Sequence, residues 1–509
     1  MDPALHREVW SPSRRTVLKA TLGVALASQL EFFDRLVVTP ERPALAAGTL
    51  PNIQFDIGNF IAPAQTLNGV QVRFGPVFVL FAPARLNRTP SRADQTTLAN
   101  ALNTIESVYP FSPSGAIVHI AYGVPYFNRL NQTNVANNMP RLLSNNSRFA
   151  LEEAVPAPTD VVPGNGITKK TFNVPVRIES NDVVFMIRSD QSANTGDVLA
   201  WLQGSNRLNG QTVASPAFGG LFSFQTTRLQ FTQLGMPRLI ASNQQPSPTF
   251  LDQIPGDSPM WMGFTDQQVN ASGPAQIVTF EGNSTARLTN ATSSSYFANG
   301  SIMHLSHNIE DLPQFYSRDP AAPETYQERV QYMFRSNQLG TVHGIPSEGN
   351  TDQFANGGGP FTLNNVFQGT DAAMRGARAS GGVFQPGNQT LDATFLGANR
   401  IGHEAALQRS SRAADGTPIH IRMDGPGFDG LDVPGGANTA KLQFAVFVPT
   451  AEFFRVMRVN QAALDLQNQF LGGDDEDNGL ERFITATRRQ NFLVPPRVHR
   501  SFPLRELQP

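Results

Sequence analysis

The sequence predicts an α+β protein in which helices cover a β-sheet. Short runs rich in β-branched and aromatic residues alternate with stretches whose apolar residues recur at helical spacing. This rhythm occurs once in the first half of the chain and repeats more loosely in the second half. The 42 glycines and 38 prolines, together with long polar stretches, indicate large loops. The pattern therefore favours two or three α+β lobes over a helical bundle.

The first unit is predicted over residues 47–240. Its expected strands are 70–74, 77–81, 116–122 and 183–188. A helix is expected over 92–108, because its apolar residues recur at helical spacing and Ser91 can cap its first turn. A second helix is expected over 195–202.

The second unit is predicted over residues 241–509. Its expected strands are 276–280, 301–307 and 442–448, and its expected helices are 324–334, 451–467 and 479–489. The last helix is expected because Leu480, Phe483 and Ile484 share one helical face. Residues 344–392 are rich in Gly, Asn and Gln with little periodicity, so we interpret them as a long insertion.

The composition excludes several kinds of site. Without cysteine, the chain has no disulfide framework, no zinc–thiolate site, no iron–sulfur cluster and no cysteine nucleophile. A formal net charge of −2 gives no net attraction for nucleic acid. No apolar run reaches the roughly 18 residues that span a bilayer. The motifs of serine hydrolases, zinc proteases and phosphate-binding loops do not occur.

The N-terminal residues indicate an export signal. The stretch Ser13–Lys19 contains the consecutive arginines Arg14 and Arg15, an apolar run follows, and Ala44 and Ala46 are small residues at cleavage spacing. This is the layout of a twin-arginine signal peptide over residues 1–46, which predicts a periplasmic or extracellular protein. The alternative is an ordinary basic N-terminus.

Two of the eight histidines form a close pair, and a third lies in a different setting. His304 and His307 are three residues apart on a predicted strand, so they point to opposite faces and are poor partners for one metal. His420 lies in a β-type run just before several glycine turns. A histidine at the end of an element can bind a haem iron through one ring nitrogen. A histidine bonded to a backbone carbonyl is the alternative.

Asp266 follows directly on the aromatic and apolar run that begins at Trp261. A buried carboxylate is costly unless it is paired, hydrogen-bonded or protonated, and it can then exchange a proton near neutral pH. The alternative is a turn aspartate that bonds its own backbone.

At these two motifs the chain resembles the dye-decolourising (DyP-type) haem peroxidases. Residues 263–266, Gly-Phe-Thr-Asp, are similar to the family's G-F-x-D-G signature, and His420-Ile421-Arg422 is similar to its proximal-histidine segment. Residues 442–449 are similar to the strand after that histidine, and 491–496 to the closing segment of the family.

The resemblance implies a fold of two ferredoxin-like units forming a dimeric-type α/β barrel, with one haem b in the C-terminal unit. It implies that His420 is the iron ligand, that Asp266 is the acid/base, and that Phe264, Arg422 and Phe444 line the cofactor. Hydrogen peroxide and a bulky reducing substrate would be the partners, in a possible homo-oligomer.

The chain also departs from the family pattern. Gln267 stands where the signature has its last glycine, and Met423 to Phe444 lacks the family's distal arginine. Arg287, Arg335 or Lys441 are candidates to replace it. Two other readings therefore stay open: a haem-binding or cofactor-free relative without peroxidase turnover, and an unrelated secreted binding protein.

Overall fold

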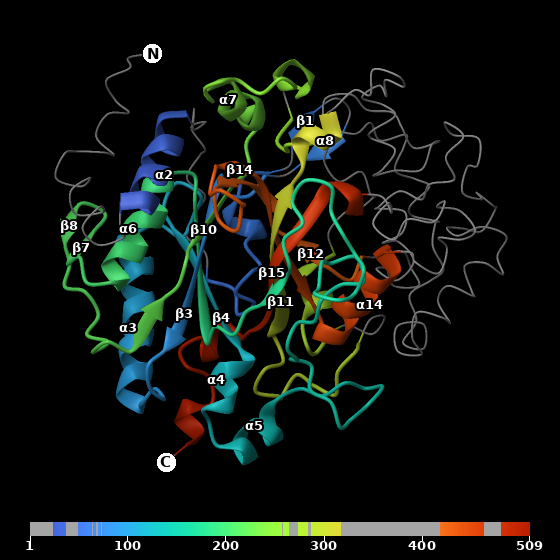
Figure 1. Ribbon diagram of the computed structural model, residues 1–509. Helices are drawn as coiled ribbons and strands as arrows, with labels where there is room; N and C mark the ends of the chain where they lie inside the picture. Colours follow the sequence, from blue (N-terminus) through green and yellow to red (C-terminus); the bar gives the residue numbers. More distant parts are fainter. Residues whose placement is uncertain are drawn as a thin grey trace.

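The structure, a computed structural model, describes residues 24–36, 49–63, 65–67, 70–72, 74–256, 258–263, 273–282, 287–316, 418–462 and 480–508. Its centre is an 11-stranded sheet with helices on its outside (Figure 1). This α+β architecture is the one that the sequence predicts.

The N-terminal half forms a ferredoxin-like unit with the order βαββαβ. Its elements are β3 Phe78–Leu86, α3 Arg92–Val108, β4 Ile117–Gly123, β6 Val183–Ser189, α6 Ser192–Leu202 and β10 Arg228–Phe231. The strands lie in the order β10-β3-β6-β4, and all neighbours are antiparallel. Both α3 and α6 lie on the outer side of this sheet in Figure 1.

The C-terminal half repeats this arrangement. Its elements are β11 Ser301–Glu310, β12 Ile421–Arg422, β13 Gly425–Asp429, β14 Thr439–Val448, α14 Ala451–Ala462 and β15 Ile484–Val494. The strand order is β15-β11-β14-β12, with β13 also paired to β14. In both units the first strand therefore lies between the fourth and the third.

The two units join edge to edge into a barrel. On one side β4 pairs with β15, through Tyr122 with Leu493 and Gly123 with Phe492. On the other side β10 packs against β13 without joining its ladder. Gly425 permits this close approach, because a Cβ at that position would lie 2.7 Å from the side chain of Gln230.

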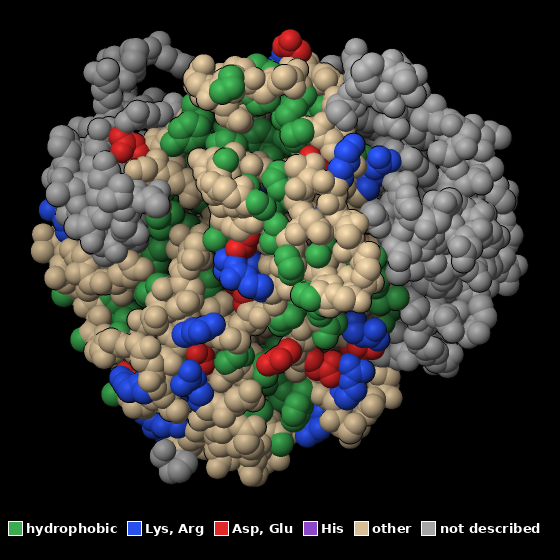
Figure 2. Space-filling view, in the orientation of Figure 1, with side chains coloured by type: hydrophobic (Ala, Val, Ile, Leu, Met, Phe, Trp, Pro, Cys, Tyr) green, Lys and Arg blue, Asp and Glu red, His purple; other side chains and the backbone are tan. Residues whose placement is uncertain are grey.

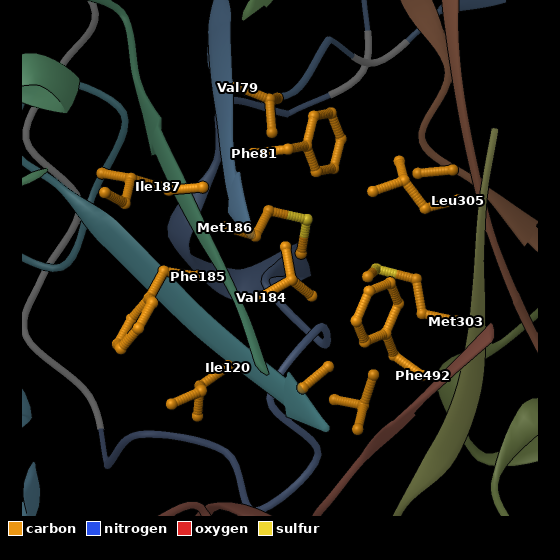
Figure 3. Close-up of a cluster of buried hydrophobic side chains, with 14 of the residues drawn as sticks. Val79, Phe81, Ile120, Val184, Phe185, Met186, Ile187, Met303, Leu305 and Phe492 are labelled. Carbon is orange, nitrogen blue, oxygen red and sulfur yellow. The ribbon is translucent and has the colours of Figure 1, made fainter. Parts of the chain in front are cut away.

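Apolar side chains from both units pack together in the part of the barrel interior drawn in Figure 3. Figure 3 shows Phe81 and Met186 of the first unit pointing toward Met303, Leu305 and Phe492 of the second. All five are almost fully buried. Because strand side chains alternate between faces, the neighbours of these residues along each strand face outward toward the helices.

The prediction of a helix over 92–108 is confirmed as α3. The hydroxyl oxygen of Ser91 accepts a hydrogen bond from the Asp94 backbone N–H, and the Asp94 carboxylate accepts one from the Ser91 backbone N–H. This reciprocal capping satisfies two donors that the helix itself cannot, which fixes the start of α3 where the sequence places it.

Two elements differ from the sequence-based expectation. Residues 479–489 are predicted as a helix, but Glu481–Phe483 is one 3₁₀ turn and β15 begins at Ile484. The segment lies between β11 and β4, so ladder hydrogen bonds override its helical spacing. Residues 276–280 are predicted as a strand, but Ala275–Val278 forms a 3₁₀ helix. Residues 324–334 and 344–392 lie outside the described residues.

The helix α2 Val24–Leu36 packs on the first unit, beside α6 and α7 Met236–Ser242. Ala27, Leu30 and Phe33 are fully buried. The Phe33 ring lies 5.1 Å from that of Phe231, and the Ser192 hydroxyl donates to the Leu30 carbonyl. This helix falls within residues 1–46, for which the sequence predicts a signal peptide.

Short elements complete the chain. They are β1 Gln65–Leu67, β2 Val70–Val72, α4 Val124–Asn128, α5 Gln132–Asn138, β5 Arg177–Ile178, β7 Arg207–Leu208, β8 Gln211–Thr212, β9 Phe222–Phe224 and α8 Leu312–Tyr316, with 3₁₀ helices at Gly58–Phe60, Leu251–Gln253, Arg497–His499 and Arg505–Leu507. Among the described residues, no helix combines the length and the apolar character that a membrane span requires.

Candidate haem site on the C-terminal unit

The outer face of the C-terminal sheet carries a series of polar and aromatic side chains. Met303 faces the barrel interior, so His304, Ser306 and Glu310 on the same strand face outward. In the β11–β14 register, Ser306 lies opposite Phe444 and His304 lies opposite Val446. Val446 also lies opposite Arg422 on β12. Two of the predicted cofactor-lining residues, Arg422 and Phe444, therefore share this face.

His420 is fully buried directly before β12. Its backbone carbonyl accepts a hydrogen bond of 3.0 Å from the Gly273 N–H. The Trp261 indole N–H donates 2.9 Å to the carbonyl of Gly427, at the other end of the same segment. Phe264 and Asp266 lie outside the described residues. The stretch that contains them nevertheless begins after Gly263 and ends before Gly273, so its described flanks both contact residues 420–427.

The two histidines of β11 are held by side-chain hydrogen bonds. The ring nitrogens of His304 pair with Asn491 Oδ1 at 2.7 Å and Ser306 Oγ at 2.6 Å. His307 faces the barrel interior, where its Nδ1 pairs with Gln443. Burial lowers the pKa of His307 to about 3, so its imidazole is neutral. The prediction that His304 and His307 point to opposite faces is confirmed.

The candidates for the missing arginine differ in position. Lys441 faces the barrel interior, on the opposite face of β14 from Phe444, and its ammonium donates to the Leu431 carbonyl. Arg287 is exposed and donates to the Thr289 carbonyl. Arg335 lies outside the described residues. Arg422 is on the outer face itself, where burial lowers the pKa of its guanidinium and the charge of Asp424 partly restores it.

Glu310 is a further candidate that the sequence analysis misses. It ends β11 on the outer face, and only 4% of its surface is exposed. Its Oε2 atom has no hydrogen-bond partner among the described residues. Burial, together with the nearby charge of Asp424, raises the pKa of Glu310 to about 8. Glu310 lies beyond the predicted strand 301–307, because β11 extends three residues further than the sequence analysis expects, so the sequence gives no signal that this carboxylate is buried.

The surface in the view of Figure 2 carries acidic and basic side chains intermingled, with no large area of one sign. That face therefore offers no basic stripe for nucleic acid. Within the described ranges, no three His, Asp or Glu side chains gather in a way that could hold a metal ion.

The family model of a group of unknown function, DUF7405, matches residues 77–351 and 383–496. The chain belongs to this family. A comparison of the DUF7405 chain with curated proteins finds no match.

Among solved structures, this DUF7405 protein is similar to a dye-decolorizing peroxidase from Bacteroides thetaiotaomicron, with 12% identity, a TM-score of 0.42, and coverage of 86% of this chain and 96% of that one. It is also similar to the encapsulated DyP-type peroxidase from Mycobacterium smegmatis, with 12% identity, a TM-score of 0.42, and coverage of 86% and 97%.

Proposed function

We propose that this protein binds haem b with His420 as the iron ligand and acts as a DyP-type peroxidase. One observation carries the proposal. The described residues on either side of the Gly263–Asp266 motif contact residues 420–427, more than a hundred residues further along the chain, because the Gly273 N–H donates to the His420 carbonyl and the Trp261 indole N–H donates to the Gly427 carbonyl. These contacts bring the flanks of the Phe264–Asp266 stretch against the segment that resembles the proximal-histidine motif.

The residues at this place suit a haem on chemical grounds. A buried imidazole is a common axial ligand of iron. Phe444 presents a half-buried aromatic ring on the adjacent outer face, and the guanidinium of Arg422 is a donor suited to a carboxylate such as a haem propionate. His304 is less suited as a ligand, because both of its ring nitrogens already have partners.

The bound haem would supply the redox chemistry that reduces hydrogen peroxide and oxidises a bulky organic substrate. The side chains of the protein would hold the haem, exclude water and transfer one proton. We assign the proton to Asp266, which resembles the acid/base of the family signature. Its carboxylate would accept the peroxide proton and return it to the leaving oxygen.

Haem reconstitution tests the ligand assignment. The wild-type protein should develop a Soret band after haem is added, and His420→Ala should lose it. His499→Ala is the matched control and should keep the Soret band. The His499 ring stacks on the Tyr296 ring at 3.7 Å, and His499 belongs to neither of the segments assigned to the haem. Haem binding that survives in His420→Ala overturns the assignment.

Peroxide-dependent dye oxidation tests the activity on the same samples. Asp266→Asn should keep the Soret band but lose about 10²–10⁴-fold in rate, the usual contribution of a positioned acid or base.

A second candidate function is haem binding without turnover. The orientation of Lys441 toward the barrel interior favours it, because this cation cannot replace the missing arginine on the outer face. A Soret band without peroxidase activity in the wild type supports that candidate.

We further propose that a twin-arginine signal in residues 1–46 exports the protein to the periplasm or beyond. The Arg14→Lys and Arg15→Lys double variant should accumulate in the cytoplasm, measured by cell fractionation. Unchanged export of the double variant contradicts this route.

A further inference from the structure

A small cavity lies on the C-terminal unit between α14, the outer faces of β11 and β15, and residues 148–158. Its volume is about 140 Å³. A cavity of about 150 Å³ on a comparable measure accommodates one benzene ring. His420, Arg422 and Phe444 do not line this cavity, so its lining is separate from the candidate haem-binding residues, although the Phe444 ring lies 6.1 Å from that of the lining residue Phe454.

The walls of the cavity are mainly apolar. Pro156, Pro158 and Ala451 contribute to them, together with Phe454 and Val459 on one face of α14. His304 forms part of the floor, where its ring stacks on that of Phe454 at 3.9 Å. Flat stacked rings and prolines offer a surface that suits a planar aromatic group.

Arginine guanidinium groups border the same space. Arg455 uses Nε and Nη2 for a bidentate pair with Glu452, which does not line the cavity. Arg458 pairs with Glu481 through Nη1 at 3.1 Å, and Glu481 also lies outside the lining. The buried Nε of Arg458 has no hydrogen-bond partner among the described residues.

Glu452 and Glu481, which lie outside the lining, therefore fix the orientation of these two guanidinium groups. Orienting an arginine in this way lowers the entropy cost of binding an anion, and a guanidinium matches the two oxygens of a carboxylate. Arg148 and Arg489 also line the cavity, and so do Glu152 and Glu153. Glu152 accepts two hydrogen bonds from Arg148, which offset its charge. The lining thus has room for one ring, apolar walls and more arginines than carboxylates.

We propose that this cavity binds a single-ring aromatic carboxylate. The ring packs between Phe454 and the prolines, and the carboxylate meets Arg455 and Arg458. The inference does not depend on haem, because the cavity is complete in residues that the haem proposal leaves unused.

Calorimetric titration of the full-length, haem-free protein tests the inference, with benzoate as the probe. Benzoate should bind in one-to-one ratio, and the uncharged benzyl alcohol should bind at least about tenfold more weakly, because it lacks the charge-assisted hydrogen bonds. Arg458→Met should weaken benzoate binding by a similar factor. Arg238→Met is the matched control, since this arginine lies on α7 and is not among the residues that line the cavity, and it should leave the affinity unchanged.

Val459→Phe provides a second test, because a larger side chain fills the cavity without removing a charge. It should abolish benzoate binding while the thermal unfolding midpoint stays close to that of the wild type. Absence of benzoate binding to the wild type overturns the inference. So does equal affinity for benzoate and benzyl alcohol, or binding that survives Val459→Phe. Loss of the Soret band in the haem experiment has no bearing on these outcomes.

Discussion

Asp160→Asn is expected to lower the free energy of unfolding by about 3–5 kcal/mol. Asp160 pairs with the guanidinium of Arg489 through two hydrogen bonds of 2.6 and 2.7 Å, and the side chains are 3% and 5% exposed. Arg489 lies within β15, the strand that joins the two halves of the barrel. The substitution keeps the shape of the side chain but leaves a buried cation without its counter-charge.

Urea denaturation monitored by circular dichroism measures this loss. Asp252→Asn is the control, because Asp252 has a side chain that is 97% exposed and lies 3.6 Å from the half-exposed Arg238. That exposed pair should contribute less than about 0.5 kcal/mol. Similar small losses in both variants would mean that the buried pair is not important for stability.

The stability of the protein is expected to fall between pH 4.5 and pH 8 because of Glu310. Burial and the charge of Asp424 raise its pKa in the folded state to about 8, from an ordinary value of 4.5. Between these two values the folded protein keeps a proton on Glu310 and the unfolded chain does not. Stability therefore decreases as the pH rises through this window, by an amount on the order of 4 kcal/mol.

Glu310→Gln isolates this contribution, because the amide has nearly the same shape and does not ionise. The variant should be more stable than the wild type at pH 8 and nearly equal to it at pH 4.5. Denaturation curves at both values provide the comparison, with Asp252→Asn as a variant that keeps the wild-type dependence. A Gln variant that loses stability with pH as steeply as the wild type would contradict the assigned pKa.

The sequence predicts the fold best where local signals decide the structure. Helix α3 is predicted with its bounds, because capping by Ser91 and apolar spacing act within one segment. Residues 479–489 are predicted wrongly, because β15 depends on pairing with β11 and β4, which lie far away in the chain. Helical spacing in a short run cannot reveal such a partner.

The same difference between local signals and long-range contacts applies to the candidate site. Strand alternation alone separates His304 from His307 correctly. The importance of Glu310 is not predictable, because its raised pKa depends on burial by residues from other segments and on Asp424. Asp266 and Phe264 lie outside the described residues, so their assigned roles stay predictions.

The packing of α2 has a practical consequence for recombinant work. A chain trimmed after Ala46 would lack the helix whose Phe33 ring covers Phe78 and Phe231. Exposing two large aromatic rings to solvent favours self-association. Preparations that retain residues 24–36 should therefore show a smaller fraction of aggregate in size-exclusion chromatography than preparations that begin at residue 47.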